Sequence, residues 1–160
     1  MGDLNETVTS DIIKEYDSTI DDGRSIIADI CEVFHENEKI KFHVSGFGQD
    51  KWPVDCLYDL VCIMEQIPDI LKEVNLEKSN FVLDFYEQGI ERTINFNLKE
   101  DNYILTCKSS TDWKPNPEVV IVKRQDVKTM LEHLIKDFLE LSRILCPHLR
   151  KQPLLVEWIF

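Results

Sequence analysis

Residues 80–109 read NFVLDFYEQGIERTINFNLKEDNYILTCKS, and apolar and polar side chains alternate along most of this stretch. Alternation with a period of two indicates β-strands that bury one face. Gln88-Gly89 and the polar run 99–102 divide the stretch into three such segments, at the spacing of hairpin turns. The stretch therefore predicts a three-stranded antiparallel meander with one face on a core.

The flanking segments favour helices that cover the buried face of this meander. Apolar residues recur at helical spacing over residues 10–36, from residue 53 or 54 to 74, and over 126–146. Gly23 leaves open whether the first segment forms one helix or two. Pro68 predicts a kink or a new start within the second segment.

Two further strands are expected outside the meander. A period of two predicts one strand over residues 38–44, and the β-branched run 118–122 predicts another that is central in the sheet or buried on both faces. These elements predict an α+β fold with two layers, a mainly antiparallel sheet of about five strands and helices packed on one face. A length of 160 residues suits a single domain over residues 1–160, with residues 1–9 frayed.

Charge is distributed unevenly along the chain. The formal net charge is −12, and residues 1–77 carry 18 acidic against 6 basic side chains, whereas residues 78–160 carry 12 of each. An acidic surface repels nucleic acid and anionic lipid, and it attracts basic proteins. We therefore expect a basic protein partner, no nucleic acid and no membrane. The alternative is that the acidic side chains serve solubility alone.

Two further features of the sequence predict a cytoplasmic protein. No apolar run approaches the length of a membrane span, and residues 1–11 lack the basic and apolar regions of a secretion signal. The five cysteines are an odd number in mostly apolar surroundings, which indicates reduced thiols rather than a disulfide framework.

The second predicted helix carries the candidate binding surface. Asp55, Asp59, Asp69 and Glu73 lie on its polar side, and no lysine occurs in the helical segment until Lys72. A solvated helix usually interleaves lysine with acids because like charges four residues apart repel each other. Together with the preceding loop, whose tryptophan suits either a lid on the core or an exposed anchor, this segment gives the candidate partner-binding residues Asp50, Trp52, Asp55, Asp59, Asp69 and Glu73.

Other groups of residues allow alternative functions. Asp84, Glu87 and Glu91 flank the first hairpin turn, where they either act as general acid and base or form the solvent face of the hairpin. Cys146 and His148 fall short of the paired spacing of metal sites, and we expect no metal and no cofactor. The apolar run 154–160 either packs back on the domain or contacts another chain.

One longer stretch carries a resemblance to known proteins. Residues 47–60 read FGQDKWPVDCLYDL, and they lead into a helix that a Phe-rich meander follows. In a small acidic α+β protein, this order resembles the bacterial immunity proteins that neutralise contact-delivered or polymorphic toxins. The resemblance implies a tight stoichiometric complex with a cognate toxin domain, often a basic nuclease whose active site is covered by acidic side chains. The binding face differs among such families, so the resemblance assigns no site residue.

These observations lead to one hypothesis and two alternatives. The leading hypothesis is a non-enzymatic inhibitor whose carboxylates contact arginine and lysine of a toxin domain in place of substrate phosphates. The first alternative is a small enzyme that uses a carboxylate pair near the 84–91 hairpin. The second is an adaptor subunit that docks through residues 154–160.

Overall fold

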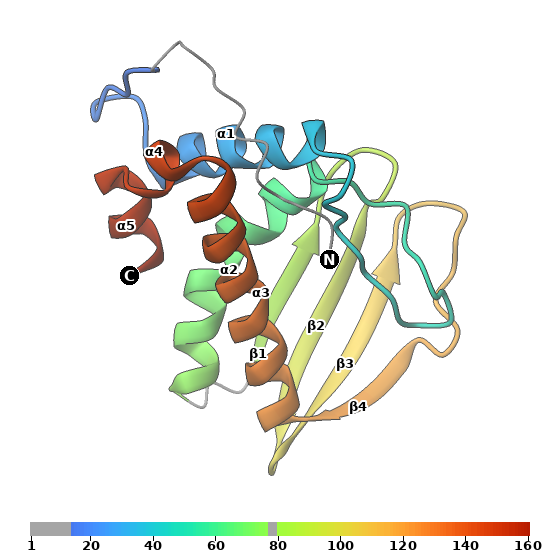
Figure 1. Ribbon diagram of the computed structural model, residues 1–160. Helices are drawn as coiled ribbons and strands as arrows, with labels where there is room; N and C mark the ends of the chain where they lie inside the picture. Colours follow the sequence, from blue (N-terminus) through green and yellow to red (C-terminus); the bar gives the residue numbers. More distant parts are fainter. Residues whose placement is uncertain (1–13, 77–79) are drawn as a thin grey trace.

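The computed structural model describes residues 14–76 and 80–160, which form an antiparallel sheet with helices packed against it (Figure 1). The elements in chain order are α1 (Gly23–Glu36), α2 (Asp59–Asn75), β1 (Asn80–Phe85), β2 (Arg92–Lys99), β3 (Asn102–Ser109), β4 (Val119–Lys123), α3 (Arg124–Leu145), α4 (Pro147–Arg150) and α5 (Pro153–Ile159).

The predicted meander is confirmed. The strands are all antiparallel in the order β1-β2-β3-β4, and Leu83 pairs with Ile94, which pairs in turn with Cys107. Odd-numbered residues of β1 and β3 and even-numbered residues of β2 point into the core. Figure 1 shows α2 and α3 on the same side of the sheet. The inner face is strongly aromatic, and Phe81 stacks on Phe96 with ring centroids 4.5 Å apart.

The expectation of about five strands is wrong, because residues 38–44 form no strand. They run as an extended connection whose Phe42 and Val44 pack against the core. Val44 accepts a hydrogen bond from the Trp52 amide at 2.8 Å, which closes a local loop and adds nothing to the sheet. The alternation in this segment thus reflects burial of one side without strand pairing.

The strand predicted at 118–122 exists as β4, but its predicted central position is wrong. β4 lies at the edge of the sheet beside β3, and the Ile121 side chain is 69% exposed. Its residues alternate between exposed and half-buried, as on a strand with only one covered face. The helix α3 follows β4 directly, beginning at Arg124, two residues before the predicted start.

The first helix is shorter than predicted. Residues 10–13 lie outside the described part of the chain, residues 14–22 are not helical, and α1 begins at Gly23 as a single helix. Asp22 caps it by accepting a hydrogen bond from the Arg24 amide at 2.8 Å, in a capping box with Ser25. Gly23 is required for packing, because an added Cβ would lie 2.1 Å from the Cβ of Trp158 in α5.

The second helix begins at Asp59 rather than near residue 53, after a turn over residues 56–58, and it runs through Pro68 to Asn75. The C-terminal run packs back on the domain as α5, with Leu155 and Ile159 buried beside α1. All five cysteines are buried free thiols. Among the helices in the described ranges, none combines the length and apolarity needed to cross a membrane.

Candidate functional site

Two of the predicted binding residues hold the start of α2. The Asp55 carboxylate accepts hydrogen bonds from the amides of Tyr58 at 2.8 Å and Asp59 at 3.3 Å. The Asp59 carboxylate accepts one from the Asp55 amide at 2.9 Å. Asp59 is only 7% exposed, and burial raises the pKa of its carboxyl, although the Asp55 amide bond opposes this. These two carboxylates are held by backbone amides of the turn that leads into α2, so they are less available to a partner than free surface acids.

Trp52 is a core residue rather than an exposed anchor. Its side chain is 1% exposed, and its ring Nε1–H donates to the Gly46 carbonyl at 3.1 Å. Its position corrects the prediction of a contact residue and agrees with the alternative, a lid on the core. The physical reason lies in its partners, because the ring packs edge-on against Phe85 at 5.1 Å and in a tilted arrangement against Trp113 at 5.8 Å.

Arg92 completes this cluster, and sequence reasoning missed it. Its guanidinium carbon lies 3.5 Å from the ring centroid of Trp113 and 4.5 Å from that of Trp52, and its Nη1 donates to Gln49 at 2.7 Å. Burial lowers the pKa of this guanidinium. The signal was present in the sequence, because Arg92 is an even-numbered residue of β2, like Ile94, and even-numbered residues of this strand face the core. The cluster joins the loop 45–53 to the loop 110–118, so we assign it a structural role.

Asp50 lies apart from the acids of α2. It is exposed on the loop 45–53, whose Phe47 carbonyl accepts a hydrogen bond from the Asn116 amide at 2.8 Å. Figure 1 shows this loop beside the β3–β4 connection, whereas α2 packs beside β1 at the opposite edge of the sheet. The six predicted residues therefore do not form one patch.

Asp69 and Glu73 do share a surface, and Glu65 joins them. The three acids lie four residues apart on α2, where successive side chains face the same side of a helix. They line a hollow of about 350 Å³ between α2 and β1, which we call the α2–β1 groove. Its lining residues are Glu65, Gln66, Asp69, Ile70, Glu73, Asn80, Phe81 and Val82. Sequence reasoning missed Glu65, although its spacing of four from Asp69 was a usable signal.

The cations near this row of acids are held by other partners or by solvent: Arg24, whose charge acts on Glu65, is paired with Asp22, and Arg124 donates to the Val74 carbonyl. Lys72 Nζ lies 3.9 Å from Asp69 Oδ1, and both side chains are well exposed, so solvent screens the pair. Glu65 accepts a hydrogen bond from the Tyr86 hydroxyl at 2.9 Å, which fixes its carboxylate at one end of the groove. The groove is therefore an acidic surface with one carboxylate held in place.

Gln66 ties α2 to β1 at the same end. Its side-chain nitrogen donates to the Asp84 carbonyl at 2.7 Å and to the Cys62 carbonyl at 2.7 Å, and its side-chain oxygen accepts from the Asp84 amide at 2.8 Å. Both amide hydrogens and the oxygen are thus used. This arrangement fixes the position of α2 along the edge of β1.

The carboxylates of the first hairpin are distributed over different surfaces. Asp84 has the outward parity of β1, whereas Glu87 faces α2 and lies 3.6 Å from the Cys62 sulfur. Burial raises the pKa of the Cys62 thiol to about 12, which keeps it protonated and poorly nucleophilic. Over residues 14–76 and 80–160, no cluster of three or more His, Cys, Asp or Glu side chains is arranged to hold a metal ion.

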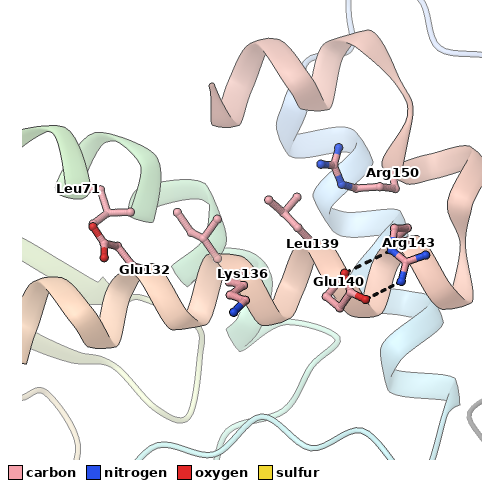
Figure 2. A pocket seen from close by; sticks show the side chains of 8 residues that line it. Leu71, Glu132, Lys136, Leu139, Glu140, Arg143 and Arg150 are labelled. Atoms are coloured by element: carbon pink, nitrogen blue, oxygen red, sulfur yellow. Dashed lines mark hydrogen bonds and ion pairs between the residues drawn. The ribbon is translucent and has the colours of Figure 1, made fainter.

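A second hollow lies on α3, between α2 and α4. Figure 2 shows its lining side chains, with Leu71 contributed by α2 and Arg150 by α4. Its volume is about 360 Å³. The rim mixes both signs of charge, and Arg143 is paired with Glu140 at 2.5 Å. This hollow favours no particular sign of partner charge.

No family model, curated protein or solved structure matches this chain.

Proposed function

We propose that this chain is an immunity-type inhibitory binding protein, which neutralises a cognate basic toxin domain, such as a nuclease, by covering its active site with an acidic surface. The observation that carries the proposal is the row of Glu65, Asp69 and Glu73 beside an open sheet edge. The cations near this row include the exposed Lys72 and also Arg24, whose charge acts on Glu65 while its guanidinium is paired with Asp22.

The proposed contact surface differs from the six residues expected from the sequence. Asp69 and Glu73 stay in it, and Glu65 is added. Trp52 leaves it because the ring is buried, and Asp55 and Asp59 leave it because backbone amides of the turn before α2 hold their carboxylates. Asp50 is exposed at a different place, so it belongs to a separate part of the surface.

An acidic row suits an inhibitor of a protein that binds phosphates. Arginine and lysine that hold a nucleic-acid backbone accept carboxylates in the same positions, with charge-assisted hydrogen bonds. The negative field also speeds encounter with such a partner and makes the rate depend on salt. The proposed protein acts in the cytoplasm by stoichiometric binding, without a cofactor and without turnover.

Affinity capture from native lysate tests this proposal. The tagged full chain is bound at low salt and washed at high salt, beside two variants with the same change of net charge. Asp69→Lys with Glu73→Lys alters the acidic row, whereas Asp112→Lys with Glu118→Lys alters two exposed acids of the β3–β4 connection.

We expect the wild type and the connection variant to retain one basic polypeptide in stoichiometric amount until the salt wash releases it. The row variant is expected to lose that polypeptide while keeping its circular dichroism spectrum. Capture that is equal for both variants, or no stoichiometric partner at any salt concentration, would contradict the proposal.

A further inference from the structure

The outer edge of β1 has backbone groups that face away from the sheet. Asp84 lies opposite Thr93 of β2, but both its amide and its carbonyl bond to the Gln66 side chain, so these two groups face away from β2. Orientation alternates along a strand, so the backbone groups of Val82 and Asn80 also face outward. Among the described residues, no backbone hydrogen bond outside the strand ladders involves the Val82 amide.

Gln66 occupies the position that a residue of a neighbouring strand would take. It donates to a carbonyl and accepts from an amide of the same residue, Asp84, which is the exchange that two paired strand residues make. Gln66 therefore closes the edge at Asp84, whereas the hollow of about 350 Å³ leaves the edge open at Val82 and Asn80. Val82 is 47% exposed there.

The acids of the groove have a spacing that matches a strand. Successive members of the row Glu65, Asp69 and Glu73 are separated by four residues, or about 6 Å along a helix axis. Alternate side chains of a β-strand are about 6.7 Å apart. A strand placed on the edge of β1 would therefore direct every second side chain toward a carboxylate of α2 over a short length.

We propose that the α2–β1 groove binds a short extended segment of the partner protein as an added strand of the sheet, with lysine or arginine at alternate positions facing α2. This inference rests on the proposed function and specifies how the partner is held. Backbone pairing with Asn80 and Val82 supplies part of the affinity, and the three carboxylates select basic side chains. The added strand ends where Gln66 occupies the edge.

The charge of the groove decides between possible occupants. A basic segment of a toxin domain complements Glu65, Asp69 and Glu73, whereas a second copy of this chain brings a further net charge of −12. The exposed edge strand of such a copy, β4, contains a single cationic residue, Lys123. A basic segment is therefore the favoured occupant.

Two synthetic peptides of equal charge test the proposal with the full-length chain. The first is acetyl-KVKVKVK-amide, which can pair as a strand, and the second is acetyl-KPKPKPK-amide, in which proline removes alternate backbone donors. Binding is followed by amide chemical shifts and by hydrogen exchange at low salt. We expect the first peptide to bind at least about tenfold more tightly, which corresponds to about 1.4 kcal/mol.

The same titration locates the bound peptide. We expect the largest shifts at the Val82 and Asn80 amides, with slower exchange of the Val82 amide, and loss of binding in Asp69→Lys with Glu73→Lys. Val82→Pro is expected to fold, because the Val82 amide faces away from β2, and to lose the preference for the first peptide. Asn80→Pro, at the first residue of the strand, serves as a second variant if Val82→Pro does not fold.

Each contrary result has a separate meaning. Equal binding of the two peptides would overturn the added strand and leave attraction of a basic partner to the acidic row intact. Binding of neither peptide would overturn the added strand and would also count against the proposed function. Pairing of the chain with itself through β1, seen as a concentration-dependent dimer that excludes the peptide, would overturn the choice of occupant.

Discussion

Removal of the Gln66 side chain should weaken the attachment of α2 to the edge of β1. Gln66→Ala deletes the two hydrogen bonds to Asp84 and the one to the Cys62 carbonyl. Each such bond contributes about 1 kcal/mol net, so we expect the free energy of unfolding to fall by about 2 to 3 kcal/mol. For a chain of this size, that loss lowers Tm by roughly 4 to 12 °C.

Urea unfolding followed by tryptophan fluorescence measures this loss, with Gln125→Ala as the control. Gln125 is exposed on α3 and makes only a long side-chain contact with Thr129, at 3.4 Å, so its removal should change stability by less than about 0.5 kcal/mol. A Gln66→Ala loss as small as that of the control would refute the role of Gln66 in holding α2.

An isosteric change separates the donor function of Gln66 from its acceptor function. Gln66→Glu keeps an acceptor for the Asp84 amide, but at neutral pH it cannot donate to the carbonyls of Asp84 and Cys62. We expect a loss of about 2 kcal/mol at pH 7. This loss should shrink as pH falls through the pKa of the introduced carboxyl, because the protonated group regains one donor. A loss independent of pH would contradict this assignment of donors.

Three further changes test other contacts. Gly23→Ala should lower stability by about 1 to 3 kcal/mol in thermal unfolding, despite the better helix propensity of alanine, because the new Cβ meets the Trp158 side chain; an unchanged Tm would contradict this contact. A double-mutant cycle of Arg92→Met and Trp113→Leu should give a coupling free energy of about 1 to 2 kcal/mol. Additive effects of the two substitutions would show that stacking of Arg92 on Trp113 does not stabilise the fold. Asp59→Asn should stabilise the chain slightly at pH 7, because the folded carboxyl has a raised pKa. Urea titrations should show this gain decline as pH falls through the raised pKa and vanish below the ordinary pKa of 3.8; a gain that persists in acid would argue against a raised pKa.

The meander could be predicted because two independent signals agree there. The alternation in residues 80–109 marks which side chains are buried, and the polar turns mark where the chain reverses. The same alternation failed over residues 38–44, where Phe42 and Val44 pack on the core from an unpaired segment. A period of two reports that one side is buried, and strand pairing requires a neighbour that the sequence does not reveal.

The acidic surface could be predicted only in part, because spacing does not show what a carboxylate does. Asp69 is exposed and Glu73 is half-buried, and both line the groove, as acids on the solvent side of a helix usually do. Asp55 and Asp59 have the same residue type and a similar spacing, but they lie at the helix start, where free backbone amides bind carboxylates. The true start of α2 had to be known before these roles could be separated.

The start of α1 shows the same limitation. Apolar residues at helical spacing continue upstream of Gly23, and they predicted a longer helix. The structure begins the helix at Gly23 because Asp22 caps it, and Trp158 leaves no room for a side chain at that first position. The requirement for glycine comes from α5, which lies far away in the sequence and gives no local signal.

The association rate of the captured partner with the full chain, measured against salt concentration, shows whether Glu65, Asp69 and Glu73 attract that partner. For the wild type and for Asp112→Lys with Glu118→Lys, we expect a rate that falls steeply with salt. For Asp69→Lys with Glu73→Lys, we expect a rate lower by about tenfold or more at low salt, with a much weaker salt dependence. Equal rates for the two double variants would contradict the account, because net charge alone would then explain the attraction.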